Sequence, residues 1–557
     1  MAKDSSADTA HPKPQKRFIH ALGLVLAAVF FAASLTPSLM PRDPFLQGVL
    51  AGAVAAIGYE IGTIIRWLWH FMDLPRPPQT WRYGPRIAAA GIALLIVIGA
   101  LWMAAGWQNA TRAAVGLDPV ETAYPVQIAS IALVVFAAIW ILLRLFGLVL
   151  GRIARLLDTV LPRRISQVIG FGLALWLFWA VIDGVALRGA FQAADASFEA
   201  ADILIEPNIP QPQDDSKTGS PASLVNWREM GRWGRSFVAT APTREDIAAF
   251  HDGPVMEPVR VYVGRRSAET SQARAELALQ ELIRVGGFDR SALVIVVPVG
   301  TGWMDPGAHD TLDFILGGDV ATVAVQYSYL TSVLSLMAHP EYGVQQARDL
   351  FNVVYAHWTR LPQENRPKLY VHGLSQGAFN SQMTMPLLDV LADPIDGALW
   401  AGSPFFSPFW SGVRDGRQVD SPAWRPRYGN GSLVRTMNQE GGVELTETPW
   451  GPIRLVFLNY GSDPIVVFTP DTAFRRPDWM TAPRAFDVSP EFQWFPVVTM
   501  FQLALDMAVS LKVERHGHYY VAPDYIDGWA AVVDPDGWSD ARADALKAIF
   551  AARGPSF

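Results

Sequence analysis

Residues 368–379 read KLYVHGLSQGAF, in which Gly373, Ser375 and Gly377 form a Gly-x-Ser-x-Gly pattern. A short run of strand-forming residues, Leu369–Val371, precedes the pattern, and a helix-compatible segment, Phe379–Leu391, follows it. This order is typical of a nucleophile elbow, a tight strand-to-helix turn that presents a serine hydroxyl. The two glycines remove the Cβ atoms that would collide with the neighbouring strand and helix. We therefore predict that Ser375 is a nucleophile.

Strands and helices alternate on both sides of this turn, from about Ser223 onward. Such alternation predicts a mostly parallel sheet with helices on both faces. The strands that we expect are Val259–Val263, Leu293–Val297, Ala321–Gln326, Leu369–Val371, Ala398–Ala401 and Ile453–Leu458. The helices that we expect are Ala268–Val285, Val344–Arg360, Phe379–Leu391, Thr499–Leu511 and Ala541–Ala552.

A serine nucleophile needs a base to take its proton, and the base needs an acid to fix its tautomer. With this kind of elbow, the acid and then the histidine follow the serine along the chain. Asp463 stands on a tight loop directly after the predicted strand Ile453–Leu458, although an aspartate before proline is also common in ordinary turns. Of the ten histidines only His516 and His518 follow Asp463, and we favour His518 as the base, with His516 as the alternative.

An oxyanion hole needs backbone N–H groups near the serine, one from the residue after it, Gln376, and one from a loop after an earlier strand. The predicted strand Leu293–Val297 runs into such a loop, where Gly300 and Gly302 permit a strained turn and Thr301 offers an N–H. A Gly-Thr-Gly loop could also hold phosphate, but this one lacks the lysine of a P-loop.

We predict neither a metal nor a cofactor. The His516–His518 pair has no third ligand at metal-site spacing. The acids that follow the Gly-Thr-Gly loop could form a metal cluster, but we expect them to cap and solvate the next helix. These acids are Asp305, Asp310, Asp313 and Asp319.

The composition of the chain and its changes along the sequence predict a membrane part and a soluble part. Its 557 residues are too many for one core, and 50% of them are hydrophobic while only 17% are charged, which indicates membrane segments. A net charge of −7 argues against a nucleic-acid partner, and the lack of cysteine excludes disulfides and thiolate chemistry. We expect a disordered cytoplasmic tail at 1–17, a membrane domain at 18–187, a linker at 188–220 that is solvated and loosely ordered, and a catalytic domain at 221–557.

Five apolar stretches in the first 187 residues are long enough to cross a bilayer at about 20 residues each. The first could be a signal peptide, but it exceeds a normal signal core and further apolar runs follow. The stretches are Phe18–Met40, Phe45–Phe71, Ile87–Trp107, Gln127–Leu150 and Ile165–Leu187.

Basic residues concentrate in the tail and in alternate loops, and basic loops remain on the cytoplasmic side. They are Lys3, Lys13, Lys16, Arg17, Arg76, Arg82, Arg86, Arg152, Arg155, Arg163 and Arg164, against only Arg42 and Arg112 in the other loops. With five spans the catalytic domain therefore lies outside the cytoplasm. If the second stretch were only interfacial, the domain would lie inside.

The sequence resembles the membrane-anchored bacterial α/β-hydrolases that carry an uncharacterised multi-span N-terminal domain, over nearly its whole length beyond the tail. The stretches that match the family are 34–42 (SLTPSLMPR), 58–62 (GYEIG), 260–264 (RVYVG), 300–306, 326–330 (QYSYL), the Ser375 elbow, 462–464 (SDP) and 517–518. The resemblance implies Ser375 as nucleophile with Asp463 and His518 as its partners. Two residues depart from the family pattern, Gln376 in place of leucine and Arg515 in place of a second glycine.

We thus expect a multi-span helical membrane domain followed by an α/β-hydrolase domain, located in a bacterial inner membrane with the catalytic domain on the periplasmic or extracellular side. The expected activity is a serine esterase or lipase-like hydrolysis of a hydrophobic ester through an acyl-enzyme on Ser375. The alternatives are an acyltransferase with the same triad, and a non-enzymatic membrane sensor or transporter whose outer domain has the hydrolase fold. Aromatic residues that could form a lid or acyl pocket are Phe405, Phe406, Phe409, Trp410, Trp494 and Phe495.

Overall fold

The computed structural model describes residues 21–72, 74–75, 84–158, 162–181, 188–338, 340–385 and 392–554. The chain forms two compact units. The first unit comprises Met1–Pro37, Arg42–Asn109 and Pro119–Leu145, and the second comprises Ser38–Pro41, Ala110–Asp118 and Phe146–Phe557. The tail predicted at 1–17 lies outside the described residues.

Three helices in the described chain are long and apolar enough to cross a membrane, within α2 (Pro44–Phe71), α3 (Gly84–Ala114) and α4 (Pro125–Leu157). Helix α1 (Ala21–Leu35) and the apolar part of α5 (Arg163–Val181) are shorter. At 1.5 Å per residue, α1 as described extends about 22 Å, less than the roughly 30 Å hydrocarbon core. Three of the five predicted spans therefore meet the requirement, and the other two predicted stretches extend into residues outside the described ranges.

Helix α2 approaches its neighbours closely through two Gly-x-x-x-Gly pairs. A Cβ atom on Gly58 would lie 2.7 Å from the carbonyl oxygen of Leu26 in α1. One on Gly52 would lie 2.5 Å from the carbonyl oxygen of Ala132 in α4. Small residues that allow such approach are how helices associate in lipid. The stretch at 58–62 therefore lets helices pack closely in the first unit.

The prediction of a loosely ordered linker at 188–220 is wrong in its first half, where the second unit has helix α6 (Arg188–Ile203). The segment is rich in alanine, the strongest helix former. It is also held by charge, because Asp202 accepts the N–H of Arg232 at 3.0 Å and Glu206 lies 2.7 Å from the Arg232 guanidinium.

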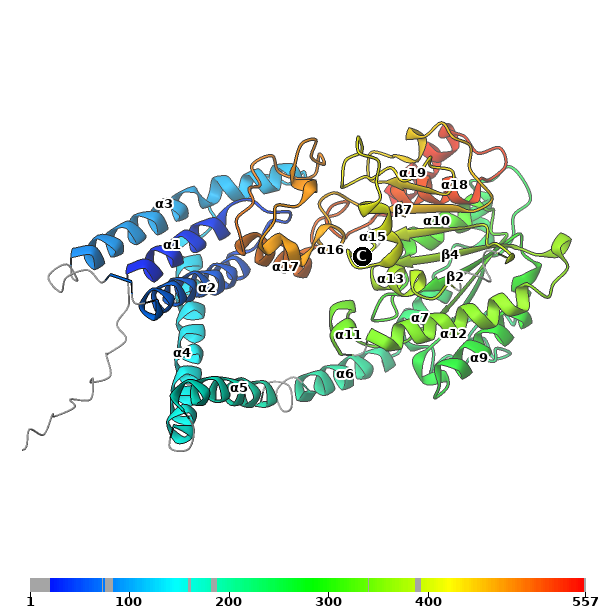
Figure 1. Ribbon diagram of the computed structural model, residues 1–557. Coiled ribbons are helices and arrows are strands. Elements are labelled where there is room, and N and C mark those ends of the chain that lie inside the picture. The colour runs from blue at the N-terminus through cyan, green and yellow to red at the C-terminus, as the bar shows by residue number, and fades with distance from the viewer. Residues whose placement is uncertain are drawn as a thin grey trace, which may run out of the picture. The chain divides into compact units, whose positions relative to one another are not determined.

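Seven parallel strands form the sheet of the second unit in the order β1-β3-β2-β4-β5-β7-β6 (Figure 1). The six predicted strands are confirmed to within a few residues at their ends, and the edge strand β6 was not predicted. The strands are β1 Val259–Val263, β2 Ala292–Val297, β3 Val320–Val325, β4 Lys368–Leu374, β5 Gly397–Ala401, β6 Val434–Met437 and β7 Arg454–Leu458. The interior strands are buried along nearly their whole length, so this sheet is the core of the unit.

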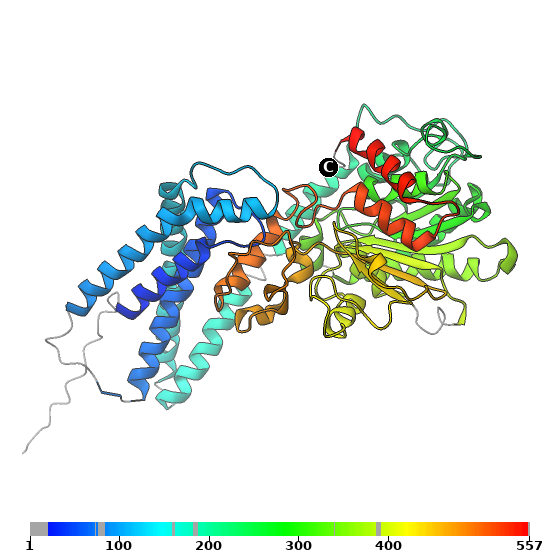
Figure 2. The same ribbon diagram turned by 90° about the horizontal axis from the view of Figure 1, so that it is seen from above.

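Helices cover both faces of the sheet, as predicted. One face carries α9 (Ser271–Arg284), α12 (Pro340–Trp358) and α13 (Gln376–Gln382), and the other carries α10 (Pro306–Ile315), α18 (Ala522–Val533) and α19 (Asp540–Arg553) (Figures 1 and 2). The remaining helices are α7 Gly231–Ala239, α8 Arg244–Ala248, α11 Ser332–Ala338, α15 Pro408–Asp415, α16 Pro464–Val467 and α17 Val498–Val509. Helix α13 begins three residues before the predicted Phe379, and residues 386–391 of that prediction lie outside the described ranges.

The strand order places a topological switch between β2 and β4. The chain leaves β2 through α10 toward β3, and it leaves β4 through α13 toward β5, on the opposite side. Residues Val297 and Gly373 are register partners at the ends of these two strands. In parallel sheets, ligands bind in the crevice where the order reverses, beyond the carboxyl ends of the strands. The loops that follow β2 and β4 are therefore where a site is expected.

Candidate active site

Ser375 occupies the strained turn that the Gly-x-Ser-x-Gly pattern predicts. Its backbone has φ 57° and ψ −124°, and its N–H donates to the carbonyl of Ala401 at 3.0 Å. A Cβ on Gly373 would lie 2.4 Å from the carbonyl carbon of Gly377, and one on Gly377 would lie 2.1 Å from the carbonyl oxygen of Val297. Both glycines are thus required by close backbone approach. A non-glycine residue held at positive φ is typical of functional turns.

Asp463 and His518 are brought together from loops 55 residues apart. Asp463 follows β7 and begins α16, where its Oδ1 accepts the N–H of Ile465 at 2.8 Å. Its Oδ2 lies 2.6 Å from His518 Nδ1, and both side chains are buried. Because an ionised carboxylate only accepts hydrogen bonds, Nδ1 carries the proton and Nε2 of a neutral ring presents its lone pair. Nε2 is buried and has no hydrogen-bond partner among the described residues.

The imidazole of His518 lies at the strand ends that carry Ser375. A Cβ on Gly402, the residue after β5, would lie 2.4 Å from His518 Cε1. Ala401, directly before Gly402, accepts the N–H of Ser375. The described contacts do not include a hydrogen bond between Ser375 Oγ and His518 Nε2. Such bonds are often long before substrate binds.

His516 lies in a different environment. Its ring is partly exposed, and Nδ1 lies 3.0 Å from the carbonyl oxygen of Glu514, two residues earlier. No acid contacts it among the described residues. The geometry therefore favours His518 over His516 as the residue that pairs with Asp463.

Two further side chains hold this pair, and the sequence did not single them out. The Tyr520 hydroxyl donates to Asp463 Oδ2 at 2.8 Å and accepts the N–H of Tyr460 at 3.3 Å. Burial, and then the Asp463 carboxylate, raise the pKa of Tyr520 well above its usual value, so its hydroxyl remains a donor. Ser462 accepts the N–H of Gly517 at 2.9 Å and thus joins the acid loop to the histidine loop. The only sequence signal for either was its position beside Asp463 or His518.

The N–H groups of the Gly300–Gly302 turn after β2 differ in whether they have an acceptor among the described residues. The N–H of Gly300 donates to Ser332 Oγ at 3.2 Å, and that of Gly302 donates to the carbonyl of Val299 at 2.8 Å. Gly302 has φ +88°, as the predicted strained turn requires. No acceptor for the N–H of Thr301 occurs among the described residues. Gln376 begins α13, so its N–H has no intrahelical acceptor either.

Thr301→Pro removes this N–H, and we expect turnover to fall about 100-fold because one oxyanion donor typically contributes that much. Thr301→Ala is the matched control: it keeps the N–H and loses only the hydroxyl, so its turnover stays within a few-fold of wild type. Steady-state ester hydrolysis measures both. Wild-type turnover in a folded Thr301→Pro protein would remove Thr301 from the oxyanion hole.

Aromatic side chains gather beside the elbow helix. The ring of Phe379, one turn after Ser375, lies 4.9 Å from that of Phe406. Phe405 lies 5.0 Å from both Phe406 and Phe468. This aromatic cluster of Phe379, Phe405, Phe406 and Phe468 contains the first two of the predicted lid residues.

The other predicted lid residues have other contacts. Phe409 packs on Trp400, and Trp410 packs on Phe457, so both contact the sheet. The indole N–H of Trp494 donates to the carbonyl of Thr472 at 2.8 Å.

The acids after the Gly-Thr-Gly loop have structural partners. Asp305 caps α10 by accepting the N–H of Gly307, as predicted, and burial raises its pKa to about 7. Asp310 and Asp313 do not solvate the helix start; each lies 2.6 Å from the guanidinium of buried Arg260. Asp319 accepts the N–H of Ser291 at 3.0 Å. Within the described ranges, no group of three potential metal ligands occurs.

Models of known protein families match both the N-terminal and the C-terminal part of the sequence. The model of an alpha/beta-hydrolase family matches residues 259–546, just over half of the chain. The model of the N-terminal region of an alpha/beta-hydrolase family matches residues 35–242. No curated protein and no solved structure matches the chain. With a parallel seven-stranded sheet, a serine on a strained turn after β4 and a family match over these same elements, the chain belongs to an α/β-hydrolase family.

Proposed function

We propose that this protein is a membrane-anchored serine hydrolase that cleaves a hydrophobic carboxylic ester through an acyl-enzyme on Ser375. The observation that carries this proposal is the 2.6 Å contact between Asp463 and the His518 Nδ1, which leaves the buried Nε2 without a hydrogen-bond partner among the described residues. A hydrolase-type fold alone does not specify activity, whereas a base with its acid and a serine on a strained turn does favour nucleophilic catalysis.

In the proposed reaction, His518 Nε2 takes the proton of Ser375 Oγ while the oxygen attacks the ester carbonyl carbon. The N–H groups of Gln376 and Thr301 stabilise the negative oxygen of the tetrahedral intermediate. The intermediate collapses as His518 returns the proton to the leaving alcohol, and the acyl group stays on Ser375. Water, deprotonated by the same histidine, then attacks the acyl-enzyme carbonyl. The bond to Ser375 Oγ breaks as His518 returns that proton to the oxygen, which restores the hydroxyl and releases the carboxylic acid.

The aromatic cluster supports an apolar acyl group as the substrate moiety. Phe406 is 41% exposed even though it contacts both Phe379 and Phe405, so this cluster has apolar surface still open to a ligand. Each methylene that moves from water onto such a surface contributes about 0.8 kcal/mol, or roughly fourfold in affinity. Apolar helices in the same chain are consistent with a substrate that is enriched in membranes.

A series of 4-nitrophenyl esters from acetate to decanoate tests the proposed substrate class. We expect kcat/KM to rise about fourfold per methylene over the first few added carbons, for the reason just given. Phe406→Ala should flatten the rise for long chains, while Leu511→Ala, a change at another exposed apolar residue, should not. Highest activity on acetate would contradict an apolar acyl site. Added glycerol separates hydrolysis from acyl transfer, since a transferase would form the glyceryl ester in place of the free acid.

We also propose that the protein lies in a bacterial inner membrane with its catalytic domain, residues 221–557, on the periplasmic side. The basic loops on either side of α3 and α4 fix those helices, so the side of the catalytic domain depends on whether α5 crosses. A single cysteine at Val419, a fully exposed position in this cysteine-free chain, reports the side. We expect a membrane-impermeant maleimide to label it in intact spheroplasts; labelling only after lysis would place the domain inside.

A further inference from the structure

The stretch at 34–42 has a structural role that is separate from the proposed reaction. Its residues Ser38–Pro41 belong to the second unit, and Ser38, Leu39 and Met40 are all at least 97% buried there. Ser38 Oγ lies 3.2 Å from one carboxylate oxygen of Asp506, and the N–H of Leu39 donates to the other at 3.1 Å. Asp506 lies on α17 and has no exposed surface. A buried carboxylate is costly without such donors, so this segment satisfies a charge inside the second unit.

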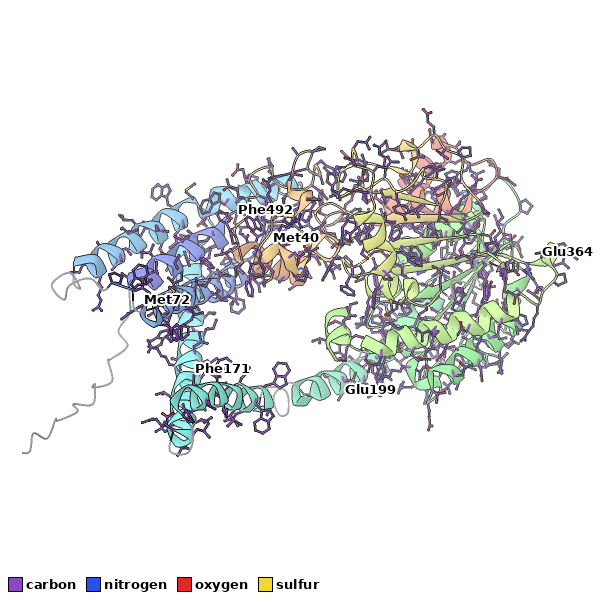
Figure 3. The ribbon with its side chains drawn as sticks, in the orientation of Figure 1. Met40, Met72, Phe171, Glu199, Glu364 and Phe492 are labelled. Carbon is purple, nitrogen blue, oxygen red and sulfur yellow. The ribbon has the colours of Figure 1, made fainter. Side chains whose placement is uncertain are left out.

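Met40 packs on the residue directly before the candidate base (Met40 is labelled in Figure 3). A Cβ on Gly517 would lie 2.9 Å from Met40 Sδ and 3.1 Å from its Cε. It would also lie 2.6 Å from the carbonyl oxygen of Ser510. The Cα of Gly517 is therefore enclosed between the Met40 thioether and the end of α17.

The end of α17 also holds the base itself. The N–H of His518 donates to the carbonyl of Ser510 at 2.8 Å, and Ser510 follows Asp506 by one helical turn. Thus Ser38 and Leu39 fix α17 at Asp506, and α17 fixes the backbone of His518. Together with the Met40 contact on Gly517, two separate chains of contact lead from this segment to the histidine.

The histidine loop has a backbone that needs outside support. Gly517 has φ +60°, and Arg515, a non-glycine residue, has φ +63°. Conformations of this kind cost free energy and persist only where the surroundings enforce them. The Ser462 hydroxyl supports the loop by accepting the N–H of Gly517, and Met40 lies where a Cβ on Gly517 would point.

We propose that Ser38–Met40 is a positioning segment that holds the His518 imidazole in register with Ser375. This proposal rests on the proposed function. It implies that residues 221–557 do not form a complete catalytic domain, because a segment between helices α1 and α2 completes the support of the base.

The test uses the full-length protein in detergent micelles, with a fluorophosphonate probe and a 4-nitrophenyl ester. Met40→Ala removes the contact on Gly517, and we expect kcat and the labelling rate to fall about 10- to 100-fold, as misplaced catalytic groups do, with KM little changed. Met40→Leu keeps the volume and should restore most of the rate. Met72→Ala, at a methionine that is 52% exposed, is the matched control and should behave as wild type.

A double-mutant cycle separates positioning from general loss of structure. If Met40 acts through His518, then Met40→Ala causes no further loss in a His518→Ala background, where no base remains to be positioned. An equal fold-loss in both backgrounds would overturn the proposal, as would wild-type kinetics in folded Met40→Ala. Should that variant fail to fold, Ser38→Ala, which removes the hydroxyl that contacts Asp506 and the Met40 carbonyl, takes its place in the same cycle and must show the same non-additivity.

Cysteine pairs test the contact without relying on activity. The chain has no cysteine, so oxidation of Ser38→Cys/Asp506→Cys should give one linked peptide by mass spectrometry, and Ser38→Cys/Val419→Cys should give none. A missing link in the first pair overturns the docking of the segment. If wild type takes no probe while the link forms, the proposed function fails and the positioning role falls with it, although the contact itself stands.

Discussion

Ser375→Ala is expected to reduce ester hydrolysis by about ten-thousand-fold or more, the largest effect of any single substitution in this chain. The change removes only the hydroxyl oxygen, because alanine keeps the Cβ that already occupies the turn at φ 57°. Without Oγ no acyl-enzyme forms, and the remaining oxyanion donors and bound water provide only residual catalysis. The measurement is turnover of a 4-nitrophenyl ester by purified protein, alongside the melting temperature.

Ser411→Ala is the control for this experiment, since Ser411 lies on α15 and, within the described part of the chain, its hydroxyl bonds to the carbonyl of Pro408 in the same helix. It should keep wild-type turnover. If folded Ser375→Ala protein retained more than a tenth of the wild-type rate, Ser375 would not be the nucleophile, and the proposed acyl-enzyme would be abandoned.

His518→Ala is expected to lower turnover by about a thousand- to ten-thousand-fold, whereas His516→Ala should stay within about threefold of wild type. The two residues are matched in type and in loop, but among the described contacts only His518 meets Asp463, and its Nε2 is buried without a hydrogen-bond partner among the described residues. Asp463→Asn should fall between them, because an amide can no longer both accept from Nδ1 and stabilise an imidazolium.

The opposite pattern would reassign the base. If His516→Ala abolished turnover and His518→Ala did not, the 2.6 Å contact between Asp463 and His518 would be structural, and the loop would have to rearrange for catalysis. Loss in neither variant would remove the acid–base pair from the proposed mechanism altogether.

The elbow and the positions of six strands were predictable from sequence because their signals are local. Two glycines flanking Ser375 at a spacing of two residues dictate a tight turn, and apolar runs such as Leu293–Val297 dictate a buried strand. Asp463 could be singled out as the candidate acid because it follows a strand end, a position that the sequence records directly. The choice between His516 and His518 is different, since it depends on which ring meets Asp463 in space.

The features that the sequence did not reveal are held by distant partners. In sequence, the segment of helix α6 looks like a polar linker, because its contacts with Arg232 through Asp202 and Glu206 appear only in the folded structure. Nothing in the sequence distinguishes Tyr520 from other tyrosines, because its hydrogen bond to Asp463 forms only in the folded structure. The Ser38–Met40 segment is 468 residues from Asp506 along the chain, and no periodicity or motif links the two.

The number of membrane spans is harder to predict from the sequence than the position of the apolar stretches. Apolar composition alone made five stretches look alike, but a span also needs enough continuous helix to match the bilayer. Helices α2, α3 and α4 have that length in the described residues, and α1 and α5 do not. Sequence hydropathy therefore found where the apolar chain lies, and the number of five spans stays a prediction, because the first and fifth stretches extend into residues outside the described ranges.

The most direct test of the central claim is covalent labelling of the full-length protein by a fluorophosphonate, followed by peptide mass spectrometry. The probe mimics the tetrahedral intermediate at phosphorus and needs no knowledge of the substrate. We predict that one adduct forms, that it lies on the peptide containing Ser375, and that Asp463→Asn and His518→Ala slow its formation strongly. Folded wild-type protein that takes no probe, or that takes it on another serine, would contradict the account.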